Sequence, residues 1–301
     1  MLNKPKLDRL GHERSQVITR LDADGARVLL WHDGRFLMRQ HEPVLFSLAD
    51  LPGDARISTG PVYLGSDQGM DYLACSLVSA GSDSADQAFV GLREAGLVVD
   101  EFWFELLFYA QGLLNWHARN PFCAQCGGRT EATGAGHSRQ CVNPGCGRTL
   151  YPKIDPAVIF SITRQSADGP RILLARKPGW NDHRHSVVAG FVEPGERLED
   201  AVRREAWEET GLVVEQVEYT GSQPWPFPDA LMVGFNCFAQ NEDITLIDGE
   251  LASARWYSTD QIETGLRDGS LSMPYRRSIA WQLIDRWFSA HRGSTLDSVG
   301  G

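Results

Sequence analysis

The first third of the chain contains short apolar runs separated by polar turns, a pattern typical of β-strands. In RVLLWHDGRFLMR, Asp33 and Gly34 stand between two such runs and predict a tight hairpin. The runs PVYLG and MDYLACSLV predict further strands. The segment FWFELLFYAQGLLNWHA, Phe102 to Ala118, is apolar on most sides and predicts a buried or interface helix. We interpret residues 1–117 as a β-rich domain that ends in this helix.

Strands alternate with helices from about Lys153 onward. AVIFSITR and RILLARK predict a strand pair, a helix follows around Val202, and VEYTGSQ, MVGFNCFAQ and ARWYS predict three further strands. YRRSIAWQLIDRWFSAHR predicts an amphipathic helix near the end. This order predicts an α+β fold with a β-rich domain (1–117), a short segment (118–152), a second domain (153–293) and a flexible tail (294–301).

Composition and charge narrow the class of partner. Hydrophobic residues make up 42% and charged residues 23% of the chain, which is typical of a globular protein with a sizeable core. The net charge of −10 disfavours general nucleic-acid binding, but it fits a small phosphorylated substrate whose charge is bridged by divalent cations. No apolar run approaches the roughly 18 residues of a membrane span, and MLNKPKLDRLGHERSQ lacks the apolar core of a secretory signal. We therefore expect a cytoplasmic protein without a membrane partner.

Four of the six cysteines fall within a short segment that is rich in glycine. Their spacing is C-x2-C, fourteen residues, then C-x4-C, and the residues are Cys123, Cys126, Cys141 and Cys146. Paired thiolates on two tight turns suit a tetrahedral structural Zn²⁺ site, and Gly127, Gly128 and Gly145 fall where the chain must turn. Two disulfides are the alternative, although clustered cysteines outside an oxidising compartment favour metal. Cys75 and Cys237 lie in apolar surroundings, and we expect both to be buried.

The same segment carries an excess of positive charge. Five basic residues stand against one acid, Glu131; they are Arg119, Arg129, Arg139, Arg148 and Lys153. Such a patch could meet RNA or a substrate phosphate, and it could equally be solvated surface.

A glutamate-rich helix is predicted between Gly190 and Leu212. At about 100° per residue, Leu198, Val202, Glu205 and Glu209 share one stripe, which Glu208 flanks, whereas Asp200, Arg203 and Arg204 take the opposite side. The apolar residues of this stripe are expected to face the core, so the carboxylates that continue the stripe should also point inward. Clustered carboxylates repel each other unless cations bind them. Mg²⁺ or Mn²⁺ would supply that compensation. A solvated helix face is the alternative. Gly211 is expected to end the helix in the left-handed conformation.

This segment resembles the Nudix box, G-x5-E-x7-R-E-U-x-E-E-x-G-U. The matching residues are Gly190, Glu196, Arg204, Glu205, Glu208, Glu209, Gly211 and Leu212, with Ala206 in place of a bulky aliphatic residue. The resemblance implies an α/β/α sandwich that hydrolyses a pyrophosphate with divalent metals. It implies metal ligation by Glu205, Glu209 and the Ala189 carbonyl, with Glu208 as a further ligand or the base. Glu250 resembles the family's additional acidic ligand, although its spacing alone would suit a surface acid.

A second motif, SQPWPFPDALM, resembles the signature of the NADH pyrophosphatase family within the Nudix hydrolases. Its candidate substrate-binding residues are Gln223, Pro224, Trp225, Pro226, Phe227, Pro228, Asp229 and Ala230, and Ala230 replaces the family's usual serine. Three prolines stiffen the loop, and its aromatic rings and amide suit a dinucleotide. The resemblance implies the reaction NAD(H) + H₂O → NMN(H) + AMP, or removal of an NAD cap from RNA.

The same resemblance implies further contacts and a homodimer. Tyr151 and Phe191 would sandwich a base or nicotinamide ring, Tyr151 acting across the dimer interface. Ala280 would line the nucleoside pocket, and Arg93 would be a basic substrate contact. Two alternatives stay open: a Nudix hydrolase for ADP-ribose or nucleotide sugars, and a zinc-ribbon nucleic-acid-binding protein with an inactive Nudix scaffold.

Overall fold

The computed structural model describes residues 7–14, 16–17, 25–51, 57–79 and 86–299. The chain divides into two compact units. Unit 1 comprises Met1–Ile154 together with Pro226–Asp229, and unit 2 comprises Asp155–Trp225 and Ala230–Gly301. Among the described residues, no helix is long and apolar enough to cross a membrane.

Unit 1 contains a β-sheet that is covered by helices. Its strands are β1 (Ala26–His32), β2 (Arg35–Arg39), β3 (Glu42–Pro43), β4 (Leu45–Phe46), β5 (Ile57–Asp67), β6 (Met70–Leu77) and β7 (Ala88–Gly91). The main order is β3-β2-β1-β6-β5, and β1 runs parallel to β6. Asp33 and Gly34 form the predicted hairpin turn between β1 and β2, both with positive φ (44° and 78°). That turn type matches the right-handed twist of the strands.

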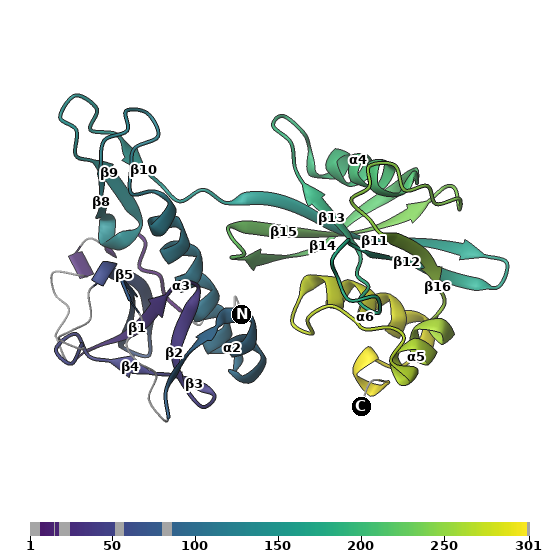
Figure 1. The fold of residues 1–301 in the computed structure, drawn as a ribbon, viewed down its shortest axis with the longest axis horizontal. Helices are drawn as coiled ribbons and strands as arrows, with labels where there is room; N and C mark the ends of the chain where they lie inside the picture. The colour runs from purple at the N-terminus through teal and green to yellow at the C-terminus, as the bar shows by residue number, and fades with distance from the viewer. Residues whose placement is uncertain (1–6, 15, 18–24, 52–56, 80–85, 300–301) are drawn as a thin grey trace. The chain divides into compact units, whose positions relative to one another are not determined.

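Two helices follow this sheet (Figure 1): α2 (Leu92–Val98) and α3 (Glu101–Arg119). The predicted helix over Phe102–Ala118 is confirmed as α3, which packs along β5 and β6. The Asp100 carboxylate starts it by accepting a hydrogen bond from the Trp103 backbone N–H at 2.9 Å. Helix α2 was not predicted, because its seven residues are too few for a clear helical period.

The cysteine-rich segment forms a separate three-stranded sheet in unit 1. Its strands are β8 (Thr130–Thr133), β9 (Ser138–Cys141) and β10 (Thr149–Leu150), in the order β10-β9-β8. Arg139 is buried and donates to the Thr130 carbonyl at 2.8 Å and to His117 Nδ1 at 2.8 Å. Burial lowers the pKa of His117 to about 4, so the ring is neutral and can accept this hydrogen bond. These contacts attach the small sheet to α3.

Unit 2 contains a six-stranded mixed sheet. Its strands are β11 (Asp155–Ser166), β12 (Gly169–Arg176), β13 (Val188–Phe191), β14 (Val214–Trp225), β15 (Ala230–Ala239) and β16 (Ser253–Tyr257). The order is β14-β15-β11-β12-β16, with β13 also paired to β11. β11 runs parallel to β15 and antiparallel to β12.

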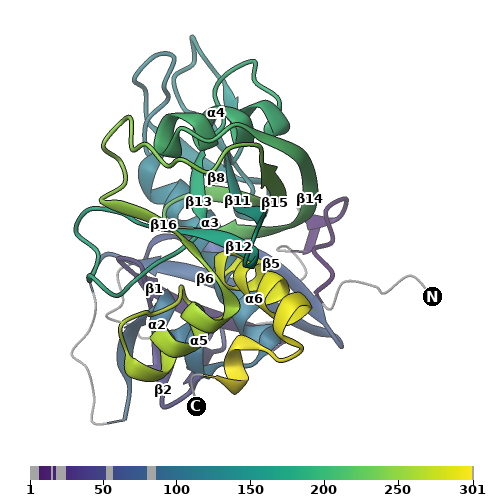
Figure 2. The same cartoon turned by 90° about the vertical axis from the view of Figure 1, so that its right-hand side faces the viewer.

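Helices cover both faces of this sheet, which confirms the expected α/β/α sandwich. Figures 1 and 2 show α4 (Leu198–Thr210) on one face and α5 (Thr259–Asp268) and α6 (Ile279–Arg292) on the other. Side chains along β11 alternate between the two layers: Val158 and Phe160 lie in the cluster with α4, and Ile159 lies in the cluster with α6. This two-sided burial explains why β11 reads as a nearly continuous apolar run.

Three details near the C-terminus differ from the sequence analysis. The last long helix begins at Ile279 and not at Tyr275, because Ser278 is its N-cap and accepts from the Trp281 N–H at 3.2 Å. Helix α5, which the sequence analysis did not identify, begins with a capping box at Ser258. Residues Leu296–Ser298, which the sequence placed in a flexible tail, form a 3₁₀ turn that buries Leu296.

Candidate active site and zinc centre

Helix α4 carries the predicted carboxylates and is fixed by its apolar positions. Ala201, Val202 and Ala206 are fully buried against the sheet. Glu209 continues this buried side of the helix with no exposed surface, and the Glu205 side chain is 12% exposed. Gly211 ends the helix with a φ of 70°, as predicted. The stripe of carboxylates thus faces inward, and the solvated-face alternative does not describe these two residues.

Glu209 is the most deeply buried acid of this group. Neither of its carboxylate oxygens accepts a hydrogen bond from a described residue. Burial, followed by the charges of Glu205, Glu250 and Asp248, raises the pKa of Glu209 to about 7, although Lys177 acts in the opposite direction. A buried carboxylate without hydrogen-bond donors is costly unless a cation compensates it. This residue therefore fits a site for a bound cation.

Glu205 lies directly beneath β13. A Cβ atom on Gly190 would lie 1.9 Å from Cδ of Glu205, so only glycine allows the carboxylate to approach this strand. Burial also raises the pKa of Glu205 above its usual range, and the Arg204 guanidinium opposes that shift. Ala189, whose carbonyl the family resemblance assigns to metal binding, precedes Gly190 on the same strand and pairs with Ile159.

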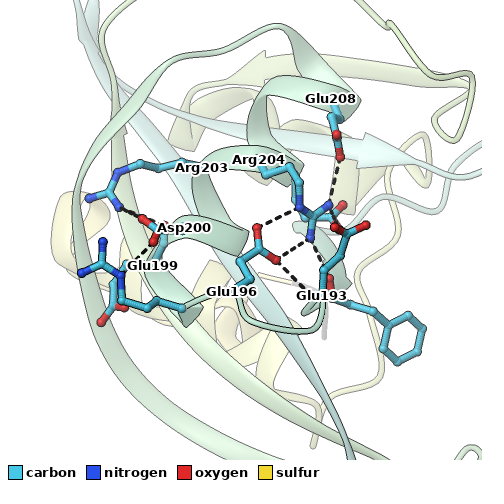
Figure 3. Close-up of polar contacts among 10 residues, drawn as sticks. Glu193, Glu196, Glu199, Asp200, Arg203, Arg204 and Glu208 are labelled. Atoms are coloured by element: carbon cyan, nitrogen blue, oxygen red, sulfur yellow. Dashed lines mark hydrogen bonds and ion pairs between the residues drawn. The ribbon is translucent and has the colours of Figure 1, made fainter.

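Arg204 joins the carboxylates at the surface end of this group (Figure 3). Its guanidinium donates to Glu196 Oε1 at 2.9 Å, Glu205 Oε1 at 2.8 Å, Glu208 Oε2 at 2.9 Å and the Phe191 carbonyl at 2.8 Å. The prediction that Arg204 lies opposite the carboxylates is therefore wrong for its side chain, because the long arginine stem reaches back across the helix. Asp200 and Arg203 pair separately, as Figure 3 shows.

Lys177 and Glu250 complete the charged group. Lys177 Nζ lies 3.5 Å from Glu209 Oε1 and 3.7 Å from Glu250 Oε2. The structure thus brings Glu250 to the same ammonium as Glu209, although 40 residues separate the two acids along the chain. In the sequence, the only signal of Lys177 is its place at the end of an apolar strand, which does not reveal its two acidic neighbours.

The four clustered cysteines also come together. The ligand atoms of Cys123, Cys126, Cys141 and Cys146 all lie within 4.8 Å of one another. Each knuckle is closed by backbone hydrogen bonds, Cys123 N–H to the Gly128 carbonyl at 2.7 Å and Cys141 N–H to the Arg148 carbonyl at 2.9 Å. Four thiolates in one small cluster suit a closed tetrahedral Zn²⁺ site and leave no position for catalysis. In the second knuckle Gly145 lies in the turn, as predicted, and Gly147 after it has a positive φ of 54°.

Domain-family comparisons match three successive parts of the chain. The NUDIX domain matches residues 154–282, the NADH pyrophosphatase-like rudimentary NUDIX domain matches 25–116, and the NADH pyrophosphatase zinc ribbon domain matches 118–151. The chain belongs to the NADH pyrophosphatase group of Nudix proteins.

Curated relatives of this Nudix chain agree with that assignment. It is 42% identical over 207 residues to the NAD-capped RNA hydrolase NudC of Mycobacterium bovis, covering 66% of this chain and 64% of the relative. It is 35% identical to Nudix hydrolase 19, chloroplastic, of Arabidopsis thaliana (79% of this chain, 57% of the relative). It is 37% identical to the NAD-capped RNA hydrolase NUDT12 of Macaca fascicularis (65% and 42%). The matched region thus spans less than two thirds of each relative.

Residues Pro226 to Asp229 of the SQPWPFPDALM motif, called the proline-rich motif below, contact α3 within unit 1. Gln111 Nε2 donates to the Pro226 carbonyl at 3.0 Å, and Asn115 Nδ2 donates to the carbonyls of Pro226 and Pro228, both at 3.2 Å. Asp229 forms an ion pair with Arg119. The Arg93 guanidinium lies 4.4 Å from the centroid of the Phe227 ring. Arg93 and Phe227, both candidate substrate contacts, therefore contact each other.

Gln223, at the start of the motif, is held in unit 2. Its Nε2 donates to the Arg277 carbonyl at 2.7 Å, and its Oε1 accepts from the Ile279 N–H at 2.8 Å. This amide, expected to meet the substrate, therefore holds the beginning of α6. Trp225 and Ala230 face each other across β14 and β15, and both are partly buried. Pro224 pairs with Leu231 in the same ladder.

The remaining candidate contacts differ in exposure. Tyr151 and Phe191 are 62% and 59% exposed, so both rings offer an open face. Tyr151 lies in unit 1 and Phe191 in unit 2. Ala280 is buried in the cluster beneath α6. Its side chain packs in that core.

The basic patch that was expected on the cysteine-rich segment is smaller in the structure. Arg139 is buried and bonded within unit 1, and Arg119 pairs with Asp229. Arg148 donates to the neutral Gln125 Oε1 at 2.6 Å and keeps its charge at the surface. The surface charge available to an anionic partner is therefore lower than the count of basic residues indicates.

Proposed function

We propose that this chain hydrolyses the pyrophosphate bond of NAD(H) to give NMN(H) and AMP, using Mg²⁺ or Mn²⁺. The observation that carries the proposal is the buried carboxylate of Glu209 beside Glu205 and Glu250, which calls for a cation. The aromatic residues of the proline-rich motif and the domain-family matches support a dinucleotide as the substrate. Glu205, Glu209, Glu250 and the Ala189 carbonyl would hold the metal, and Cys123, Cys126, Cys141 and Cys146 would hold a structural Zn²⁺.

The metal ligands, Arg204 and Glu208 would have different roles in this reaction. When bound, a divalent metal would neutralise the pyrophosphate oxygens and lower the pKa of a bound water. Arg204 holds Glu205 and Glu208 in fixed positions, so their carboxylates need no reorganisation when substrate arrives. Glu208 is more exposed than Glu205 and Glu209, with 48% of its side chain accessible. This exposure supports a role for Glu208 in accepting a proton from water.

The first test is hydrolysis of NADH in the presence of Mg²⁺ or Mn²⁺, with products identified by mass. NMNH and AMP are the expected products, and none should form after chelation of the metal. Cleavage of ADP-ribose without cleavage of NADH would retain Nudix chemistry and reject the substrate. Inactivity on both would favour the nucleic-acid-binding alternative.

A second candidate substrate is the NAD cap of RNA. The support is that two of the relatives are named NAD-capped RNA hydrolases. The same reaction on a capped RNA would release NMN and leave a 5′-monophosphate end. Turnover of capped RNA far below that of NADH at low salt would reject this substrate.

The chain is further proposed to act as a cytoplasmic homodimer. The exposed ring of Tyr151 supports a contact with a second copy, because large exposed aromatic residues are enriched at interfaces. Light scattering during size-exclusion chromatography tests the mass, and a monomer would reject the dimer. Cell fractionation tests the compartment.

A further inference from the structure

Lys177 occupies the centre of the acidic group in unit 2. Its ammonium is within 4 Å of carboxylates from two separate segments, Glu209 at the end of α4 and Glu250 before β16. Lys177 directly follows β12, whose last residue, Arg176, accepts a hydrogen bond from the Ala252 N–H at 2.8 Å. The backbone near both Lys177 and Glu250 is therefore held together by the sheet.

The ammonium compensates the negative charge of Glu209 when this carboxylate is ionised. The Glu209 side chain is 1% exposed, and Lys177 is its ion-pair partner among the described residues. Because a buried carboxylate without a cation is strongly destabilising, Lys177 stabilises this arrangement when no metal is present. The Lys177 side chain is 38% exposed, so part of it already lies in solvent.

A divalent ion bound by Glu209 and Glu250 would lie close to this ammonium. Like charges a few ångströms apart repel strongly at the effective dielectric constant of a partly buried site. Glu209 and Glu250 are also two of the residues that the proposed function assigns to the metal. Binding of a divalent ion there therefore opposes the ion pairs of Lys177.

We propose that Lys177 is the resident counter-ion of the metal site: it pairs with Glu209 and Glu250 when metal is absent and is displaced when a divalent ion binds. The inference rests on the metal ligands of the proposed function. Its consequence is that metal binding is a competition, so the affinity for metal is lower than the carboxylates alone would give.

The test is the affinity for Mn²⁺, measured by electron paramagnetic resonance without substrate. K177Q removes the charge, and we expect it to bind Mn²⁺ roughly tenfold more tightly, since one competing charge near a partly exposed site is worth about one decade. K177R keeps the charge and should bind Mn²⁺ as the wild type does. R171Q is the matched control, because Arg171 lies on the same strand and, among the residues that the structure describes, donates only to the backbone carbonyls of Asp168 and Pro170.

Thermal unfolding gives a second readout that does not depend on activity. Metal stabilises a protein in proportion to the logarithm of its concentration over Kd. The difference in Tm between EDTA and Mn²⁺ should therefore be larger in K177Q than in R171Q. Folding of K177Q only in the presence of Mn²⁺ would also support the inference.

Three results would overturn the inference. Unchanged or weaker Mn²⁺ binding in K177Q would show that Lys177 does not compete with the metal. Failure of K177Q to fold even with Mn²⁺ would show that a divalent ion cannot replace the ammonium. Absence of Mn²⁺ binding in the wild type would overturn the metal assignment of the proposed function as well, and this outcome is distinguishable because it does not involve the variant.

Discussion

Gly190 packs so closely against the Glu205 side chain that a methyl group on residue 190 would overlap the carboxylate. An ideal Cβ atom there would lie 1.9 Å from Cδ and 2.1 Å from each carboxylate oxygen of Glu205. Gly190 belongs to β13, and Glu205 belongs to the middle of α4. The glycine that begins the box therefore acts on the glutamate fifteen residues later.

G190A should move Glu205 out of position and reduce NADH hydrolysis by at least about 100-fold, a loss typical of removing one preorganised group. The clash should also lower the free energy of unfolding by about 1–3 kcal/mol. Kinetics and denaturant unfolding check both effects. G91A is the matched control, because Gly91 has a φ of −63° and its Cβ would meet no atom within 4 Å. Full activity in G190A would contradict the role of this close approach.

E205Q should abolish hydrolysis while the fold is retained. The amide keeps the shape of the side chain, but it loses the charge that a divalent metal requires. We expect a loss of at least about 100-fold in kcat and an unchanged circular dichroism spectrum. E199Q is a suitable control, since Glu199 is exposed in the first turn of the same helix. Unchanged turnover in E205Q would reject the catalytic assignment.

Stability of the metal-free protein should depend on Glu209. Its pKa is about 7 in the fold against an ordinary value of 4.5, so the folded state binds a proton that the unfolded state releases. The free energy of unfolding should therefore fall as pH rises from about 4.5 to 7 and change little above that range. The effect is at most about 3 kcal/mol. Unfolding in EDTA at several pH values measures it, and E209Q should lack this dependence. A wild-type profile that matches E209Q would contradict the shift.

The purified chain should contain about one Zn²⁺ per molecule, measured by elemental analysis. C123S removes one of the four thiolates and should reduce zinc content and loosen the small sheet of β8, β9 and β10, because a segment of this size lacks a hydrophobic core. Hydrogen exchange over residues 118–152 reports the loosening. C75S is the control, since Cys75 is buried in the core of unit 1 and is not one of the four clustered cysteines. Normal zinc content in C123S would reject the four-thiolate site.

N115L should release the proline-rich motif. Asn115 donates to two carbonyls of this motif, and each hydrogen bond is worth about 1 kcal/mol. We expect faster hydrogen exchange over residues 223–230 and a KM for NADH that is roughly 5- to 10-fold higher, with kcat less affected. E105Q serves as the control, because Glu105 is on the exposed side of α3. Faster exchange with an unchanged KM would show that the motif does not contact the substrate.

Features with a strong local cause could be predicted from the sequence. Asp33 and Gly34 required a turn with positive φ, and the apolar spacing from Leu198 to Val202 fixed which side of α4 is buried. Each pair of cysteines lies on a short knuckle that is closed by its own backbone, and the pairing of β8 with β9 brings the two knuckles together. The turn, the buried side of α4 and the shape of each knuckle are all decided by interactions within a few residues.

Features that depend on distant partners could not be predicted. Arg204 was placed by helical angle alone, and the angle does not report how far its side chain reaches. From the sequence, Gln223 was predicted to contact the substrate, whereas in the structure its amide accepts a hydrogen bond from the first residue of α6. Lys177 acquires its role only when α4 and the segment before β16 bring two acids to it. Such roles are set by the tertiary arrangement and leave no periodic signal.

Strand β11 has a different tolerance for substitution than for insertion. One row of its side chains, including Val158 and Phe160, supports the helix that carries the acids, and the alternate row, including Ile159, supports the layer beneath α6. An exchange of one apolar residue for another disturbs a single layer. Insertion of one residue in this strand would exchange the two rows beyond it. The length of this strand is therefore more tightly constrained than its composition. Proteins that evolve from this one should accumulate apolar substitutions in β11 long before they accept an insertion or a deletion there.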